Sequence, residues 1–336
     1  MQRSRNEAPG QRPRSAAARS PVRQTGNNRR ASPVKRKIVR RRRYRILGRR
    51  FIPFVIFLTI GLISLSMLIS YGVSSLRRRH DNALLAQEFS GEILQESETA
   101  LPAPEFSPRP TELTTPPPAL LDTYRNLSGE PIDKMERLYQ RNQDLIGWLY
   151  IRGVVDLPVV YRDNDYYLTH TFGKKRDKGG ALFLDEDHPL TEESQNLVIH
   201  GHNMYDGSMF GILGSYIHPS AVKSGAFASF TTMYAQEEYV IFAVLRVTPD
   251  PASEGYFNYL GRPVFQDEDD FYRYIGEVKD RSIIGIPVDV QPMDSILTLA
   301  TCVDDDRLVV FFRRIREGET KDQLQELADQ AYKVKQ

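Results

Sequence analysis

The sequence predicts a mainly β fold, a closed β-barrel with helices on its connections, preceded by one transmembrane helix. Residues 51–71 contain no charged side chain. Prolines then recur between 102 and 118. After residue 130 the chain shows many short β-type runs separated by turn residues and only a few helical patterns. Many short strands with few helices are typical of a closed barrel.

The N-terminal 50 residues form a strongly basic tail. They hold 18 of the 45 Lys and Arg residues and one acid, Glu7, whereas the chain after residue 80 is strongly acidic. A tail rich in Arg, Ser, Pro and Gly is expected to be largely disordered. Because it has few aromatic residues and adjoins an apolar span, we expect it to face anionic lipid headgroups rather than nucleic acid.

Residues 51–76 are expected to form a signal-anchor helix. Its apolar part is long enough to cross the roughly 30 Å hydrocarbon core, and it is longer than the apolar part of a cleaved signal peptide. The positive-inside rule places the basic tail in the cytoplasm. The sequence therefore predicts a single-pass protein of the cell membrane whose larger part is extracellular.

Residues 77–120 are expected to form an extracellular proline-rich spacer, and residues 121–336 a globular domain. PIDKMERLYQRN (131–142) predicts the first helix of this domain, because proline is allowed in the first turn and apolar residues follow at helical spacing. The other predicted helices cover 209–217 and 265–279. The predicted strands are 146–151, 157–161, 181–184, 196–200, 239–247, 296–301 and 308–312.

Cys302 is the only cysteine of the chain and ends a β-type run, ILTLATC. It cannot form an intramolecular disulfide, and outside the cell a free thiol is open to oxidation. A lone cysteine is often only a small buried apolar residue. Its compartment and a nearby arginine favour a nucleophile instead.

Two histidines, His200 and His202, follow the strand predicted at 196–200 and are candidate bases or acids. The spacing His-x-His also suggests zinc, but zinc needs three or four ligands, and the chain has one cysteine. We therefore expect neither a metal nor another cofactor.

Arg307 opens the strand that follows Cys302. A hairpin between the two strands would bring its guanidinium back to the thiol, where it could stabilise an oxyanion. From spacing alone, a solvated surface charge is the simpler interpretation. Arg313 and Arg314 are alternatives at the far end of the same strand.

These motifs together resemble the sortases, the surface transpeptidases of Gram-positive bacteria. The similarity rests on TLATC (298–302), VIHGHNMYDGSMFG (198–211), NDYYL (164–168) and the arginine on the following strand. With the helix at 265–279, the pattern is most similar to class B. Two features depart from the class: Val303 stands where relatives carry an acid, and the loop from Cys302 to Arg307 is short.

The resemblance implies an eight-stranded barrel and the catalytic residues Cys302, His202 and Arg307, with Asn164, Leu168 and Thr301 in the substrate groove. It implies cleavage of a C-terminal sorting motif (NPxTx- or LPxTG-like) after its threonine. The acyl group then passes to a cell-wall or pilin amine. The expected partners are therefore surface proteins bearing this motif and a peptidoglycan precursor or pilin.

Two other functions fit parts of the sequence. A papain-like Cys/His peptidoglycan hydrolase would use the same residue types, although there cysteine precedes histidine and opens a helix. A non-catalytic surface adhesin would explain the anchor and the spacer but not the thiol. The sorting motif, acceptor amine, calcium dependence, oligomeric state and role of the basic tail are not determined by the sequence.

Overall fold

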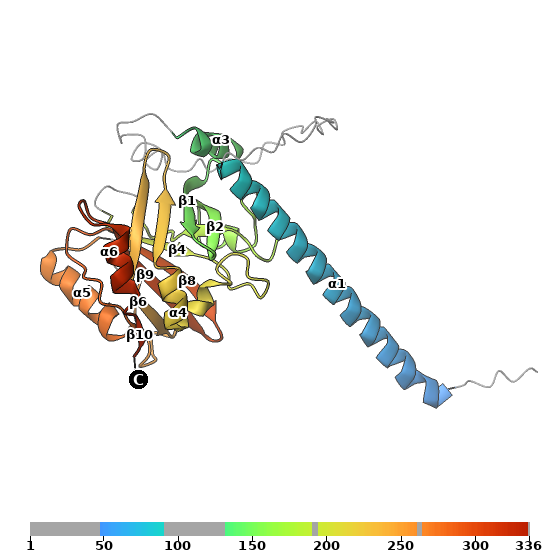
Figure 1. Cartoon of the computed structure of the whole chain (residues 1–336). Coiled ribbons are helices and arrows are strands. Elements are labelled where there is room, and N and C mark those ends of the chain that lie inside the picture. Colours follow the sequence, from blue (N-terminus) through green and yellow to red (C-terminus); the bar gives the residue numbers. More distant parts are fainter. Residues whose placement is uncertain (1–47, 91–131, 190–193, 261–263, 335–336) are drawn as a thin grey trace, which may run out of the picture. The chain divides into compact units, whose positions relative to one another are not determined.

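A computed structural model describes residues 48–90, 132–189, 194–260 and 264–334 of the chain (Figure 1). The predicted basic tail up to residue 47 and the predicted spacer between 91 and 120 lie outside these residues. The chain divides into two compact units, residues 1–59 and 60–336. In the first unit the structure describes only the start of helix α1 (Gly48–Ser90). The barrel, its contacts with the later turns of α1 and the candidate site all lie in the second unit.

The second unit is built around a closed eight-stranded β-barrel, as predicted. Around the barrel the strand order is β1-β2-β3-β4-β8-β9-β6-β5. The neighbours β2 and β3 are parallel, as are β4 and β8, and the other pairs are antiparallel. The barrel strands are β1 (Leu145–Ile151), β2 (Val155–Val160), β3 (Leu182–Leu184), β4 (Asn196–His200), β5 (Phe227–Thr231), β6 (Gln236–Val247), β8 (Ile296–Val303) and β9 (Asp306–Arg314).

Several of the described helices lie on connections between strands, whereas the first two precede β1. A 3-10 turn η1 (Tyr166–Leu168) joins β2 to β3, and α5 (Glu268–Asp280) follows β6. The predicted helices at 131–142 and 265–279 are confirmed as α3 (Asp133–Arg141) and α5. Asp267 begins α5 by accepting a hydrogen bond from the Asp270 backbone N–H at 2.8 Å.

Three predictions about elements were incomplete or wrong. The expected helix at 209–217 is a 3-10 turn, η2 (Leu213–Ile217), followed by α4 (Pro219–Ser224), because Pro219 fits a helix start better than a helix interior. Strand β5 was missed. So was the C-terminal addition, α6 (Lys321–Ala328) and β10 (Tyr332–Lys333), which pairs with the short β7 (Ile284–Gly285).

Helix α1 does not end where the predicted spacer begins. It continues from the apolar segment to Ser90, so residues 77–90 at the start of the predicted spacer are helical. Leu85 is buried, and the ring of Phe89 stacks on Trp148 with centroids 4.2 Å apart. These apolar contacts pack the last turns of the helix on the barrel wall.

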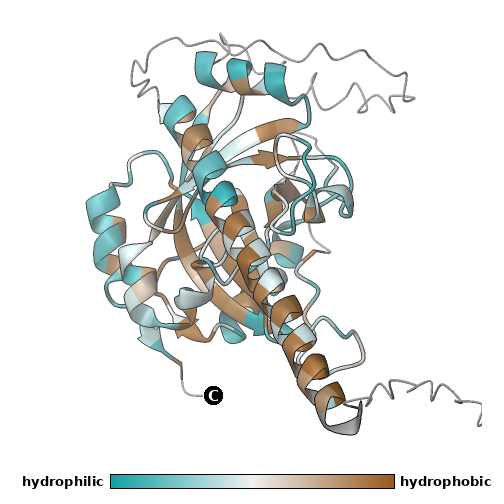
Figure 2. Ribbon diagram, turned by 90° about the vertical axis from the view of Figure 1, so that its right-hand side faces the viewer, coloured by the Kyte–Doolittle hydropathy of each residue, from teal (hydrophilic) through white to brown (hydrophobic). Residues whose placement is uncertain are grey.

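The buried apolar side chains of this unit form two clusters. The larger one fills the barrel and reaches α5 and α6. The smaller one contains Trp148, Tyr167 and Leu85, with Phe89 packed against it, and so joins α1 and α3 to the barrel wall. Among the described helices, α1 alone is long and apolar enough to cross a membrane. Figure 2 shows the long apolar part of this helix and its more hydrophilic C-terminal turns.

Candidate active site

Three neighbouring strands bring the predicted catalytic residues to one end of the barrel. Strand β4 runs parallel to β8, with His200 opposite Ala300. The Gly201 N–H donates to the Ala300 carbonyl at 3.2 Å, which extends the pairing past the strand end. The same register continued by two residues places His202 level with Cys302.

Arg307 lies directly across the β8–β9 hairpin from Cys302. Opposite residues of an antiparallel pair have Cα atoms about 4.5–5.5 Å apart and side chains on the same face. The short loop between them, which departs from the family pattern, is therefore a tight turn that preserves this pairing. Asp304 occupies it with a φ of 55°.

The acids of this turn do not neutralise Arg307. Arg246 on β6 binds Asp306 at 2.6 Å and Asp304 at 3.1 Å. No carboxylate among the described residues forms an ion pair with Arg307, which is half-buried beside an exposed thiol at Cys302. Its charge is therefore available to a substrate oxygen.

The two alternative arginines have structural roles. Arg313 is completely buried and binds both carboxylate oxygens of Glu319, at 2.6 and 2.7 Å. Arg314 binds Glu237 at 2.7 Å. Of the three, Arg307 alone lies beside the cysteine.

The surroundings of the two histidines distinguish them. His200 Nε2 lies 2.9 Å from a carboxylate oxygen of the buried Asp185. Burial would raise the pKa of Asp185, but the hydrogen bond and charge of His200, together with further hydrogen bonds, hold it below its usual value. His200 is thus engaged in a buried pair at the wall of the site.

His202 is half-buried, and its imidazole makes one hydrogen bond to the described residues, from Nε2 to the Leu168 carbonyl at 2.9 Å. A carbonyl can only accept, so Nε2 carries a proton. Nδ1 has no hydrogen-bond partner among the described residues, so it is the ring nitrogen available for proton transfer.

The three predicted groove residues have different environments. Leu168 is 36% exposed and lies beside His202. Asn164 uses both ends of its amide within the protein, donating to Asp185 at 3.1 Å and accepting from the Glu186 N–H at 3.0 Å. Thr301 is buried, and its hydroxyl donates to the Gly201 carbonyl at 2.8 Å. The last two therefore support the site's walls in this structure.

Tyr259 is a residue near the candidate site that the sequence did not reveal. Burial raises the pKa of its phenol to about 12, and the charges of Arg307, Asp185 and Cys302 act on it as well. Its backbone carbonyl accepts a hydrogen bond from Tyr274 of α5 at 3.2 Å. Its phenol is therefore neutral at physiological pH. No motif marks it, because it lies in an irregular loop.

Comparisons with known proteins agree with this geometry. Residues 152–315 match the family model "Sortase domain", and this range includes His202, Cys302 and Arg307. A Sortase B of Listeria monocytogenes is 34% identical over 179 residues, which are 53% of this chain and 70% of the relative. The chain belongs to the sortase family.

A second relative and a solved structure extend the comparison. A Sortase B of Staphylococcus aureus is 28% identical over 173 residues, which are 51% of this chain and 68% of the relative. The structure of a Staphylococcus aureus sortase B–substrate complex is similar in fold, with a TM-score of 0.55 and 23% identity over 72% of this chain and 98% of the solved one. The chain is thus a transpeptidase enzyme similar to class B sortases, and the papain-like and adhesin alternatives are excluded.

Proposed function

We propose that the chain is a membrane-anchored cysteine transpeptidase that cleaves a C-terminal sorting motif of surface proteins and transfers the acyl group to an amine. The observation that carries the proposal is the register that sets Cys302 directly across from Arg307, at the end of β8 beside which β4 leads into His202. A thiol, an unpaired guanidinium and an imidazole are the groups that acyl transfer needs.

In the first half-reaction, the Cys302 thiolate, whose proton has passed to His202, attacks the threonine carbonyl of the motif, and a C–S bond forms. Arg307 donates to the resulting oxyanion. His202 donates a proton to the departing amine as the C–N bond breaks, which leaves a thioester on Cys302. An amine from a cell-wall precursor or a pilin then attacks this thioester and gives a proton to the now neutral His202, and the Cys302 thiolate leaves as the C–S bond breaks.

The groove is proposed to include Leu168, the most accessible of the predicted groove residues. Asn164 and Thr301 are proposed to affect substrate binding indirectly, because their hydrogen bonds keep the walls of the groove in place. The class B similarity favours an NPxTx motif over LPxTG.

Anchoring is part of the proposal. The apolar part of α1 is proposed to span the cell membrane with the basic tail in the cytoplasm and the barrel outside. Surface proteins and a lipid-linked acceptor would both meet the enzyme at the outer face of the membrane.

Intact mass spectrometry of the full-length protein with NPxTN and LPxTG peptides tests the function. We expect a mass increase equal to the acyl part of one peptide, located on Cys302 and lost when triglycine is added. If neither peptide forms an adduct with the protein, the proposal is contradicted. Cys302→Ala, which removes only an exposed thiol, is the control.

A further inference from the structure

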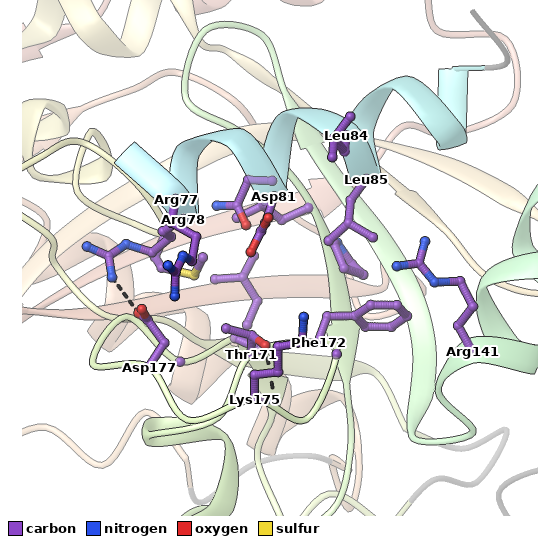
Figure 3. Close-up of a pocket in the computed structure, with 18 residues that line it drawn as sticks. Arg77, Arg78, Asp81, Leu84, Leu85, Arg141, Thr171, Phe172, Lys175 and Asp177 are labelled. Atoms are coloured by element: carbon purple, nitrogen blue, oxygen red, sulfur yellow. Dashed lines mark hydrogen bonds and ion pairs between the residues drawn. The ribbon is translucent and has the colours of Figure 1, made fainter. Parts of the chain in front are cut away.

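Arg78, in the turn of α1 after the apolar segment, is buried against the barrel although it carries a permanent charge. Its side chain is only 2% exposed. It forms an ion pair with Asp177, a second with Asp206 at 2.9 Å, and a hydrogen bond to the Ser208 hydroxyl at 3.0 Å. A guanidinium is buried in a protein only when such partners replace its water. Figure 3 shows Arg78 directed at Asp177.

The first of these partners belongs to the hairpin that carries the Leu168 carbonyl. The Asp177 N–H donates to the Thr169 carbonyl at 2.9 Å, so Asp177 lies across the hairpin from the residue next to Leu168. The Leu168 carbonyl in turn accepts from His202 Nε2. Arg78 therefore holds one loop that fixes the ring of His202.

The second partner belongs to the loop that begins with His202 itself. The Phe210 N–H donates to the His202 carbonyl at 3.0 Å, and Asn203 pairs with Met209, which closes a loop whose tip is Asp206. Burial would raise the pKa of Asp206, but hydrogen bonds from Ser208, Arg78 and Ser75 lower it well below its usual range. The tip is thus held as a carboxylate by α1.

We propose that Arg78 is a positioning residue for His202, because it fastens together the two loops that hold this histidine. The inference rests on the proposed role of His202. The segment that leaves the membrane is then a structural part of the active site as well as its anchor.

On the barrel side, Gly179 leaves the space that the Arg78 side chain occupies. A Cβ on Gly179 would lie 2.6 Å from Cδ and 2.9 Å from Nε of Arg78. Gly179→Ala therefore displaces the guanidinium without altering Arg78 itself, and it gives a second variant that tests the same contact.

The test uses the full-length protein in nanodiscs and compares Arg78→Gln and Gly179→Ala with Arg77→Gln. Arg77 is the matched control, because it is the exposed neighbour of Arg78 and has no ion pair among the described residues. Hydrogen exchange measured by mass spectrometry should rise in residues 169–180 and 202–210 in both test variants and stay unchanged in the control.

The kinetic arm compares two substrates, an NPxTN peptide and its analogue with a nitrophenyl ester after the threonine. The nitrophenolate leaves without a proton, so it does not need a well-placed His202. We expect the test variants to lose kcat for the amide by about 10–100-fold, with KM little changed, and to lose less than about threefold for the ester. The double variant should lose no more than either single one.

Several outcomes would overturn the inference. One is an equal loss for both substrates, which would indicate a general structural defect. Another is an equal effect of Arg77→Gln, and a third is unchanged exchange in the two loops. A wild-type protein that forms no thioester would refute the proposed function, whereas the exchange experiment would still decide whether Arg78 holds the loops.

Discussion

Arg307 and Arg313 lie on the same strand, β9, in opposite surroundings. Arg307 is half-buried beside an exposed thiol and has no carboxylate partner among the described residues, whereas Arg313 is fully buried on Glu319. Since an unpaired charge at a strand end can act on a substrate and a paired buried one cannot, the two should respond differently to the same substitution.

We expect Arg307→Gln to lower kcat for a sorting peptide by about 10²–10³-fold, the usual effect of removing an oxyanion donor, without changing stability. Arg313→Gln should instead lower the free energy of unfolding by about 3 kcal/mol, since it removes a fully buried guanidinium that binds Glu319 and the Asp289 carbonyl. Peptide kinetics and urea unfolding of residues 77–336 measure both. Loss of activity in Arg313→Gln at unchanged stability would contradict this assignment.

The Asp185–His200 pair should make stability depend on pH. The pKa of Asp185 is lower in the folded protein, so its carboxylate adds stability above its unfolded pKa of about 3.9. This contribution is lost as the pH falls toward the folded pKa. Asp185→Asn should therefore lower Tm clearly at pH 7 and much less at pH 3, as measured by thermal unfolding. A Tm difference that does not change with pH would contradict the prediction.

The strand pairs β4–β8 and β8–β9 explain why the catalytic residues could be predicted from sequence. Each residue stands in or directly beside an apolar run, so motif and strand end coincide. Strand β5 has no such signal. Its sequence, FASFT, is short and does not alternate apolar and polar residues, and its place between β1 and β6 is set by long-range pairing.

Helix α6 begins with a capping box whose contribution to stability can be measured. Thr320 accepts from the Gln323 N–H at 3.3 Å, and the Gln323 side chain accepts from the Thr320 N–H at 3.2 Å. Thr320→Ala should therefore lower the free energy of unfolding by about 1 kcal/mol in urea titration. Thr320→Ser, which keeps the hydroxyl, should be nearly neutral, and equal losses in the two variants would show that the cap is not the cause.

At the scale of the whole molecule, the link between α1 and the barrel was beyond the reach of sequence reasoning. The partners of Arg78 lie 99 and 128 residues further along the chain. Three consecutive arginines after an apolar stretch suggest an interfacial charge cluster, and nothing local marks the middle one as buried. Only the folded barrel brings Asp177 and Asp206 to the same side chain.

The start of the chain should therefore matter even when the membrane is absent. Proteins that begin at residues 77, 81 and 91 remove first Arg78 and then the buried Leu85 and the stacked Phe89. Relative to 77–336, we expect 81–336 to lose amide cleavage far more than ester cleavage. The shortest protein should also lose about 3 kcal/mol or more of unfolding free energy, because two apolar side chains are no longer buried.

Urea unfolding and the two substrates measure this series, with Arg77→Gln in 77–336 as the control. If 77–336 and 81–336 cleave the amide equally well, Arg78 does not position His202. If 91–336 is as stable as 77–336, the contact of Phe89 with Trp148 does not hold α1 on the barrel. We expect amide cleavage to fall first, in 81–336, and stability to fall only in 91–336. This order is expected only if the C-terminal turns of α1 help to hold the active site.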